Sequence, residues 1–302
     1  MNDLVIIARS SEIEKYIYRS KVFEYLTPYI KRVVDLSVTP DGGNLENESV
    51  LLLEHLSYFG HRNELAENIS KAKRLVWIGS DYTYPPPTQI RNAVEGKPNV
   101  VLSPSPMRFD RTTWEWVSHK NWFCVDWNKV LWQPREFVEP RVTQNLYYFG
   151  RHRNGRRKSY KRFFETDKYG LSIACGESDL FEYQKMCPGL TGHTTYYSNE
   201  FHQRFATTIY IADEFHKDHF CDIACRFYEC LSAGVAILVD IETRHIFLQH
   251  GIDPLPYCVA NDEDVKKLLP MWDEIRKAQR KSWSRDYDYE LREELKGVMG
   301  QW

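Results

Sequence analysis

The stretch LYYFGRHRNGRRKSYKR at 146–162 carries side chains that could bind a phosphorylated ligand. It is an apolar run that ends at Gly150 and is followed by arginines and lysines with no acid among them. A strand that ends in glycine and releases arginines into the next loop places guanidinium groups and free backbone N–H groups around one point. Arg151 and Arg156 are the leading candidates here. Such a point suits a diphosphate, although a solvated basic helix face is an equally common origin of a charge run.

A second stretch, RFYECLSAGVAILVD at 226–240, reads as a helix that ends near Gly234 and leads into an apolar strand. Glu229 stands five residues before this glycine, in the order by which parallel α/β domains present an acid to a ribose. Arg226, on the same expected helix, is a third candidate cation for a diphosphate. The alternative is an ordinary helix, glycine cap and strand, which any αβ unit contains.

Length and composition limit the classes of protein. With 302 residues the chain is long for one core, so two domains are expected. The formal net charge is only -2, so any nucleic-acid binding must depend on a local cluster of cations. No window approaches the length of a membrane span, and the amino terminus lacks the features of a secretory signal. Seven scattered cysteines, an odd number, indicate reduced thiols and a cytoplasmic location.

One group of possible metal ligands is His216, His219, Cys221, Cys225 and Cys230. A structural zinc site usually shows paired Cys-x2-4-Cys knuckles, which this group lacks. We therefore expect no metal.

Strands and helices are expected to alternate along both halves of the chain. Strands are expected at 3–9, 33–38, 51–59, 74–80, 99–106, 121–127, 146–150, 169–176, 206–213, 235–240 and 253–260, and helices at 12–29, 226–234 and 262–298. This order predicts an α/β protein with two Rossmann-like, doubly wound domains that face each other across a cleft. The expected domains are an acceptor-binding 1–140, a nucleotide-sugar-binding 141–275, and a helical tail 276–302 that packs back on the first domain.

These motifs resemble the glycosyltransferases with two Rossmann-like domains, known as the GT-B fold. In retaining members the second domain opens with a strand, Gly-Arg, and a basic residue five positions on, and these hold the donor diphosphate. Gly150, Arg151 and Arg156 match that spacing. Those members also carry a Glu on the ribose hydroxyls, five residues before a Gly. Glu229 and Gly234 match it.

The chain departs from the family at one position. A further acid eight residues before the ribose-binding Glu is frequent in the family, whereas this chain has Cys221 there. Asp213 or Asp222 could take the place of that acid on the sugar hydroxyls.

Together with IGSDYTYPPPTQ at 78–89, the two motifs are similar to bacteriophage glycosyltransferases, among them those that modify hydroxymethylated pyrimidines in phage DNA. The resemblance implies a hexosyl- or pentosyltransferase with a UDP-sugar as donor co-substrate and no tightly bound cofactor. It also implies double-stranded DNA carrying hydroxymethylated pyrimidines, such as hydroxymethylcytosine, as a partner, and the host cytoplasm as the location if the chain is phage-encoded.

Roles on the donor side follow from the resemblance and from the chemistry of glycosyl transfer. Cations on the diphosphate stabilise the leaving group as the anomeric bond breaks, a role for Arg151 and Arg156. We expect the strand end 175–177, with Tyr197 and Asn199, to surround the base.

On the acceptor side, Asp81 follows the expected strand 74–80 and precedes three prolines, so it is the best-placed carboxylate to take a proton from an acceptor hydroxyl. An Asx turn is the structural alternative, and Asp110 and His55 are weaker candidates for the base. A base in duplex DNA would have to be flipped out. The aromatic and basic residues that could serve this are 82–84, 114–116, Lys71, Lys73, Arg74, Arg91, Arg108 and Arg111.

Two other functions fit the same residues. One is a glycosyltransferase for a glycan or small-molecule acceptor, which suits the near-neutral charge. The other is a non-catalytic nucleotide- or DNA-binding module. The sequence leaves the sugar, the stereochemical outcome and the oligomeric state open.

Overall fold

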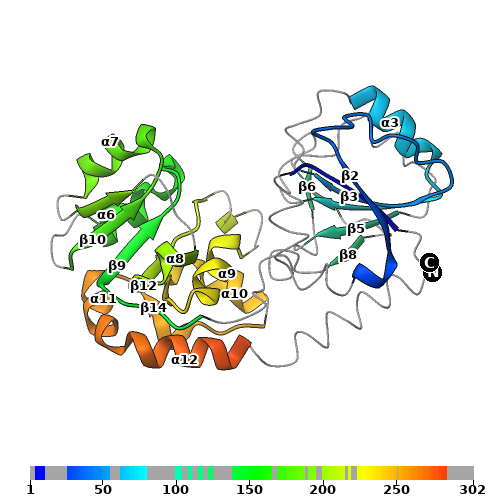
Figure 1. The fold of residues 1–302 in the computed structure, drawn as a ribbon. Helices are drawn as coiled ribbons and strands as arrows, with labels where there is room; N and C mark the ends of the chain where they lie inside the picture. Colours follow the sequence, from blue (N-terminus) through cyan, green and yellow to red (C-terminus); the bar gives the residue numbers. More distant parts are fainter. Residues whose placement is uncertain are drawn as a thin grey trace. The chain divides into compact units, whose positions relative to one another are not determined.

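A computed structural model describes residues 4–10, 26–54, 62–79, 99–103, 108–110, 115–117, 122–124, 138–164, 169–187, 190–194, 199–214, 217–218, 223–249 and 251–283. The chain divides into two compact units, Met1–Arg135 with Tyr289–Trp302, and Glu136–Asp288 (Figure 1). The domain bounds of 1–140, 141–275 and 276–302 remain predictions.

The first unit contains a parallel sheet in the order β2-β1-β3-β4-β5-β8. Valine and leucine side chains of its central strands pack against Leu65 and Ile69 of α3 (Arg62–Lys71). This is a doubly wound strand order, in which the connections change direction between β1 and β3. The strands are β1 (Leu4–Ala8), β2 (Ile30–Asp35), β3 (Ser49–Glu54), β4 (Arg74–Gly79), β5 (Asn99–Ser103) and β8 (Trp122–Cys124), and the unit also holds η2 (Thr27–Tyr29) and the antiparallel pair β6 (Arg108–Asp110) and β7 (Glu115–Val117).

The second unit has a parallel sheet in the order β11-β10-β9-β12-β13-β14. Counted within the unit, this is the Rossmann order 3-2-1-4-5-6, and the direction of winding reverses between β9 and β12. All residues of β10, β12 and β13 are buried, as expected for a parallel sheet covered on both faces. The strands are β9 (Gln144–Phe149), β10 (Leu171–Ala174), β11 (Leu190–Thr194), β12 (Phe205–Tyr210), β13 (Ala236–Asp240) and β14 (Cys258–Val259).

Helices of the second unit form two contacting groups. α6 (Arg157–Phe164) contacts α7 (Glu177–Met186) and α11 (Asp262–Leu268), whereas α9 (Cys225–Ser232) contacts α8 (Asn199–His202) and α12 (Trp272–Trp283). In Figure 1, α7 and α12 lie on opposite sides of the sheet. The remaining short helices are η4 (Asn154–Arg156), η6 (Ile241–Thr243), α10 (Arg244–Gln249), η7 (Leu255–Tyr257) and η8 (Leu269–Met271).

α9 ends in a Schellman motif at Gly234, whose φ is +79°. The Gly234 N–H donates to the Leu231 carbonyl at 3.2 Å, and the next N–H donates to the Cys230 carbonyl at 3.0 Å. A Cβ atom at Gly234 would also lie only 2.6 Å from the Val138 carbonyl oxygen. The glycine therefore serves both the helix end and the close passage of the segment 138–140, of which the sequence predicted only the first.

α12 holds the same segment from the other side. Glu139 forms ion pairs with Arg280 at 2.8 Å and with Arg276 at 2.9 Å. These two arginines are on α12, which packs against β13. Residues 276–283 of the predicted tail are thus part of a helix of the second unit, and 284–302 lie outside the described residues.

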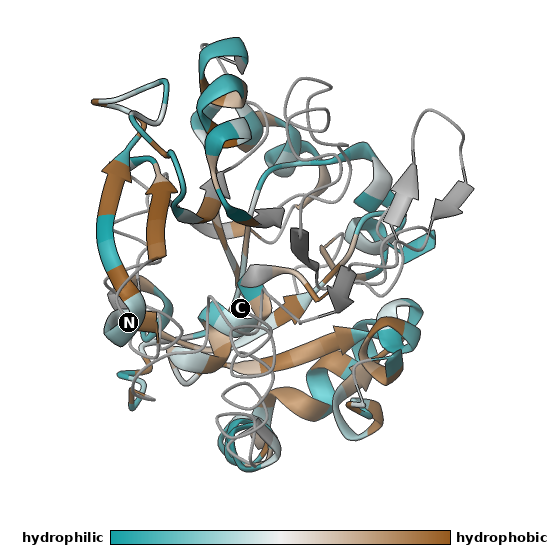
Figure 2. Cartoon of the chain, turned by 90° about the vertical axis from the view of Figure 1, so that its right-hand side faces the viewer, coloured by the Kyte–Doolittle hydropathy of each residue, from teal (hydrophilic) through white to brown (hydrophobic). Residues whose placement is uncertain are grey.

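The predicted fold class, α/β with two Rossmann-like parallel units, is confirmed. The strands are the most hydrophobic elements, as the brown arrows of Figure 2 show, and the described helices carry hydrophilic residues on their outer faces. Within the described part of the chain, no helix is both long and apolar enough to span a bilayer.

Candidate functional site

The reversal of strand order in the second unit brings the two sequence motifs to one edge of the sheet. Gly150 follows β9, and the residues from Ile211 to Asp213 follow the adjacent strand β12. Helices that leave neighbouring strands in opposite directions open a crevice at their carboxyl ends, where doubly wound domains bind ligands. The 146–162 stretch and the first turn of α9 both meet this crevice.

Gly150 is the point on which two guanidinium groups converge. Its φ of +132° strongly favours glycine, and its N–H donates to the Ala174 carbonyl at 3.0 Å. A Cβ atom placed there would lie 3.8 Å from Nη1 of Arg156 and 3.8 Å from Nη1 of Arg226. The absence of a side chain at Gly150 leaves room for a ligand between the two cations.

Arg156 is buried at the end of η4, with 7% of its surface exposed. Its Nη1 donates to the Tyr148 hydroxyl at 3.1 Å, and its Nη2 pairs with Asp213 at 3.7 Å. Burial works against the charged form, but the neighbouring tyrosines Tyr148 and Tyr160 and the carboxylate of Asp213 outweigh it, so the pKa of Arg156 is raised. Its Nε is buried and has no hydrogen-bond partner among the described residues.

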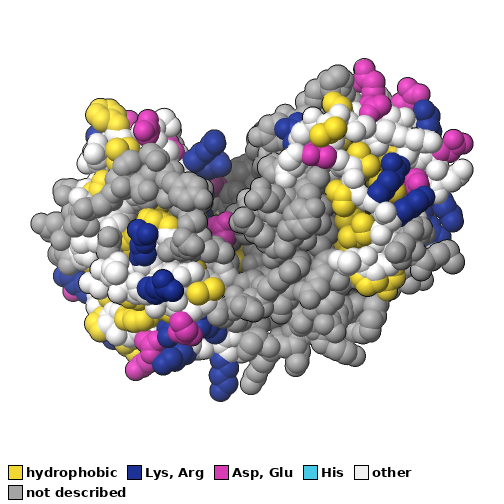
Figure 3. Space-filling view, in the orientation of Figure 1, with side chains coloured by type: hydrophobic (Ala, Val, Ile, Leu, Met, Phe, Trp, Pro, Cys, Tyr) yellow, Lys and Arg dark blue, Asp and Glu magenta, His cyan; other side chains and the backbone are white. Residues whose placement is uncertain are grey.

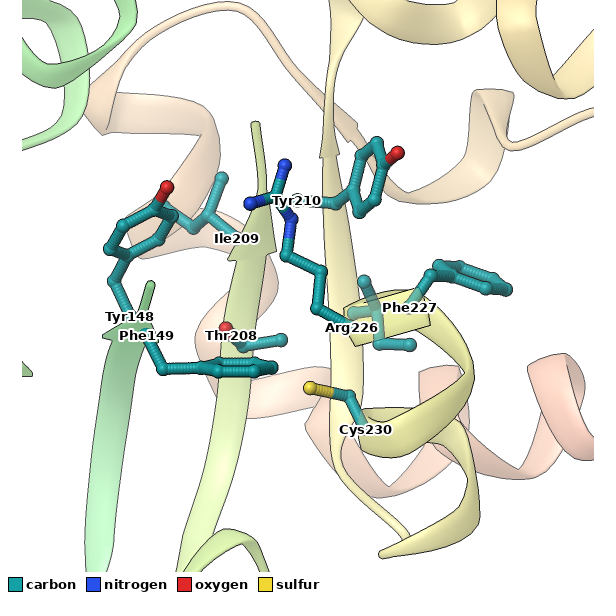
Figure 4. Close-up of a pocket in the computed structure, with 9 residues that line it drawn as sticks. Tyr148, Phe149, Thr208, Ile209, Tyr210, Arg226, Phe227 and Cys230 are labelled. Atoms are coloured by element: carbon teal, nitrogen blue, oxygen red, sulfur yellow. The ribbon is translucent and has the colours of Figure 1, made fainter. Parts of the chain in front are cut away.

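Arg226 reaches the same point from the first turn of α9. Its Nη2 donates to the Ile211 carbonyl, and its Cζ lies 5.0 Å from the centre of the Tyr210 ring, a cation–π contact. Figure 4 shows its guanidinium group between the side chains of Tyr148 and Tyr210. Its Nε is also buried without a hydrogen-bond partner in the described part of the chain.

A small, mostly apolar pocket lies under Arg226, between α9 and the strands (Figure 4). Among the described residues that line it, Arg226 is the only charged one, and its charge stands at one end of an apolar hollow. The lining residues are Tyr148, Phe149, Thr208, Ile209, Tyr210, Arg226, Phe227, Cys230 and Ile237.

The electrostatics favour an anion. Both guanidinium groups lie at Gly150, and the carboxylate of Asp213 pairs with Arg156, so an anion at Gly150 would meet guanidinium nitrogens. The two arginines also affect the hydroxyl of Tyr148. Burial raises the pKa of this hydroxyl, but the positive charges of Arg156 and Arg226 outweigh burial, so its pKa is lowered. Arg151 adds an exposed cation at the start of the loop, with no ion pair to the residues that the structure describes.

Glu229 lies three residues after Arg226 on α9, and residues three apart share a helix face. It is half-buried, and its charge contributes to raising the pKa of the buried Tyr147 hydroxyl, after the larger effects of burial and of Cys230. The motif from the sequence therefore places an acid beside the arginine that points to Gly150.

Other predicted residues lie in different places. Cys175 and Gly176 follow β10, the neighbour of β9, so the predicted base-binding strand end lies beside Gly150. Asn199 begins α8. Tyr197, Asp81, His55, Cys221 and Asp222 lie outside the described residues.

The cations Lys71, Lys73 and Arg74 are at the end of α3 and the start of β4. They lie at the amino-terminal edge of the first sheet, opposite to the edge where doubly wound domains bind ligands. Lys71 also pairs with Glu67 at 3.1 Å. These three cations are therefore poor candidates for the predicted DNA-binding rim.

Sequence reasoning missed the buried tyrosines around Arg156. Tyr148 belongs to the predicted apolar strand 146–150, and a tyrosine two residues before a strand-ending glycine can present its hydroxyl to the loop. Its hydroxyl is the direct partner of the buried arginine.

Among the described residues there is no group of three or more His, Cys, Asp or Glu side chains that could hold a metal ion. His216, His219 and Cys221 of the group considered above are not part of the described chain.

Comparison with protein-family models finds no match, and comparison with curated protein sequences finds none either. Solved structures, in contrast, resemble the chain over nearly its whole length. A variant of the T4 phage β-glucosyltransferase in complex with UDP-glucose matches with a TM-score of 0.62 and 14% identity, over 97% of this chain and 98% of that one.

The DNA-modifying enzyme β-glucosyltransferase, solved with and without uridine diphosphoglucose, matches with a TM-score of 0.67 and 15% identity, over 97% and 98% of the two chains. An α-glucosyltransferase in complex with UDP and a 13-mer DNA containing an HMU base matches with a TM-score of 0.54 and 10% identity, over the same shares. At these identities the likeness establishes the fold, which is that of the GT-B glycosyltransferases, as the resemblance of the motifs predicted.

Proposed function

We propose that this chain is a glycosyltransferase that transfers a sugar from a UDP-sugar to the hydroxymethyl group of a modified pyrimidine in DNA. The observation that carries the proposal is the convergence of Arg156 and Arg226 on Gly150, at the switch point of a Rossmann sheet. The full-length structural likeness to phage glucosyltransferases solved with UDP-glucose, and in one case with UDP and DNA, supports it.

The donor diphosphate lies against Gly150, where the side-chain nitrogens of Arg156 and Arg226 bind its oxygens and Arg151 adds a third cation. Negative charge grows on the diphosphate as the anomeric bond breaks, so these cations stabilise the transition state more than the bound donor. Glu229 binds the ribose hydroxyls.

Asp213 already pairs with Arg156. We therefore assign it to orienting that arginine and give it a smaller part in recognising the sugar. We propose that Tyr197 and Asn199 surround the base, as the sequence predicts.

The first unit binds the acceptor, and Asp81 takes the proton from its hydroxyl group. Acidic and basic side chains are interspersed on the visible face of each unit in Figure 3, so DNA binding must depend on a few local cations. It should therefore weaken as salt rises, with a modest slope. Among the described residues, Cys175, Cys187, Cys230 and Cys258 form no disulfide, which is consistent with the proposed cytoplasmic location.

Transfer can be tested by incubating the protein with a panel of UDP-sugars and three DNAs, containing hydroxymethylcytosine, hydroxymethyluracil or only unmodified bases. We expect a mass gain of one sugar on a hydroxymethylated nucleoside and none on unmodified DNA. No gain on either modified DNA would overturn the DNA acceptor, and a gain on a glycan or small-molecule acceptor would replace it. UDP binding without transfer or hydrolysis would indicate a non-catalytic module.

The donor site can be tested with Arg226→Met in binding assays with UDP and uridine. The loss of a charge-assisted hydrogen bond costs about 1.5–3 kcal/mol, which corresponds to a decrease in UDP affinity of roughly 10- to 100-fold. Uridine, which has no phosphate, should lose much less.

Arg204→Met is the matched control, because Arg204 is exposed and directly precedes β12, at the opposite edge of the sheet. Equal losses for UDP and uridine, or an equal loss in the control, would show that Arg226 does not bind the diphosphate.

A further inference from the structure

Behind Arg156, three buried tyrosines form a continuous row of hydroxyl groups. Tyr148 lies in β9, Tyr160 in α6 and Tyr183 in α7. The Tyr148 and Tyr160 oxygens are 3.3 Å apart, as are those of Tyr160 and Tyr183. The Tyr183 hydroxyl then donates to the Gly150 carbonyl at 3.3 Å. The row therefore begins at the buried arginine and ends at the glycine on which both arginines converge.

Counting hydrogens fixes the direction of every bond in this row. A guanidinium group only donates and a carbonyl only accepts, while each hydroxyl has one hydrogen to give. Tyr183 gives its hydrogen to the Gly150 carbonyl and so accepts from Tyr160. Tyr160 in turn accepts from Tyr148, whose oxygen accepts from Arg156. All four bonds point the same way, from the cation to the carbonyl.

This arrangement ties together the two ends of the loop 150–156. Gly150 is held through its carbonyl and Arg156 through its Nη1, and the hydroxyls between them polarise one another because they are aligned. Burial raises the pKa of both Tyr160 and Tyr183, so both stay neutral donors. The row thus turns a lone pair of Tyr148 toward Arg156, where it offsets part of the cost of burying the charge.

We propose that Tyr148, Tyr160 and Tyr183 are positioning residues, which hold Arg156 in the orientation that binds the donor diphosphate. The inference rests on the proposed function of this site. The three hydroxyls act through Arg156 and Gly150, and their contribution should be specific to ligands that carry a diphosphate.

Substitution of Tyr160 by phenylalanine tests the row at its middle. The Tyr160 ring packs against the rings of Tyr148 and Tyr183, with centroids 5.7 and 5.5 Å apart, and phenylalanine keeps that packing. Only the hydroxyl is lost, which interrupts the row between the arginine and the carbonyl.

Tyr169→Phe is the matched control. Tyr169 is also buried, and its hydroxyl donates to the Phe163 carbonyl at 2.7 Å, so this variant loses one buried tyrosine hydrogen bond as well. In the part of the chain that the structure describes, no hydrogen bond connects that hydroxyl with the row to Arg156.

The affinities of wild type, Tyr160→Phe and Tyr169→Phe for UDP, UMP and uridine decide the proposal. We expect Tyr160→Phe to bind UDP about tenfold more weakly, since two hydrogen bonds of the row are lost, and uridine within twofold of wild type. In turnover, the KM for the UDP-sugar should rise while the KM for the acceptor stays unchanged. Tyr169→Phe should bind all three ligands as wild type does.

The opposite outcomes are equally clear. Unchanged UDP affinity in Tyr160→Phe, or equal losses for UDP and uridine, would overturn the positioning role while leaving the donor site intact. Failure of the wild type itself to bind UDP would overturn the proposed function and the inference with it. If Tyr160→Phe does not fold, Tyr183→Phe, which interrupts the row at its far end, is judged by the same comparison.

Discussion

Replacing Gly234 with alanine tests how firmly the segment 138–140 is fixed to the end of α9. With φ at +79°, an L-residue costs about 1 kcal/mol for the left-handed conformation alone. The new Cβ would also lie 2.6 Å from the Val138 carbonyl oxygen and 3.0 Å from Pro140 Cδ. Those are contacts with backbone and a rigid ring, which cannot move aside as a flexible side chain can.

Moving the segment away has its own cost. The Val138 N–H donates to the Ser232 carbonyl at 3.1 Å, and Glu139 is held by two arginines of α12. Loss of the hydrogen bond costs about 1 kcal/mol. Together with the backbone conformation, Gly234→Ala should therefore lower the free energy of unfolding by about 2–3 kcal/mol.

Gly251→Ala separates these two contributions. Gly251 has a φ of +71° and belongs to the same unit, but its Cβ would meet no atom within 4 Å. The free energy of unfolding of this variant should fall only by the cost of the left-handed conformation, about 1 kcal/mol. Hydrogen exchange of the β13 amides, which are deep in this unit, measures both losses. Equal losses in the two variants would refute the reasoning that the segment is packed rigidly against α9.

Two further predictions concern buried ionisable groups. Burial lowers the pKa of His202 from 6.5 to about 4, so between these values the unfolded state binds more protons, and stability should fall by about 3 kcal/mol as the pH is lowered through this range. Urea denaturation between pH 7 and 5 should show a shallower fall in His202→Gln, and an unchanged fall would contradict the prediction. Asp240→Asn should cost about 3 kcal/mol, because this fully buried carboxylate accepts hydrogen bonds from Ser159 and Arg162. Glu242→Gln is the comparison, because Glu242 is half-exposed and also pairs with Arg162. This variant should lose less than about 1 kcal/mol of unfolding free energy. Comparable losses for the two variants in thermal or chemical unfolding would contradict the prediction for Asp240.

The sequence signals that define the candidate site are local. An apolar run that ends in glycine and a Glu five residues before a glycine are each contained within one strand–helix connection. What the sequence cannot contain is the order of strands in the sheet. β9 and β12 are neighbours only because the winding reverses between them, and that reversal brings Arg156 and Arg226 to Gly150.

The roles of individual arginines were harder to predict for a physical reason. The residues 150–157 pass through a loop, a 3-10 turn and the start of α6, so no single periodicity tells which side chain turns inward. The sequence does not distinguish Arg151 from Arg156, yet Arg156 is buried and Arg151 is exposed. The burial of Arg156 depends on Tyr148, in the strand just before the loop, and on Asp213, which follows a different strand and is distant in the sequence.

The positions of Arg156 and Arg226 carry a cost in folding stability. Arg156 and Arg226 each keep a buried Nε without a hydrogen-bond partner among the described residues, and an unsatisfied buried donor costs about 1–3 kcal/mol. The two Nη atoms of Arg156 contact the Tyr148 hydroxyl and the Asp213 carboxylate, and Nη2 of Arg226 donates to the Ile211 carbonyl, so both groups are held in place. The guanidinium atoms nearest to Gly150 are the two Nη1 atoms, so the proposed diphosphate would bind there and leave the buried Nε atoms as they are. The cost in folding stability therefore holds two cations in one orientation, which is the preorganisation that the proposed site requires.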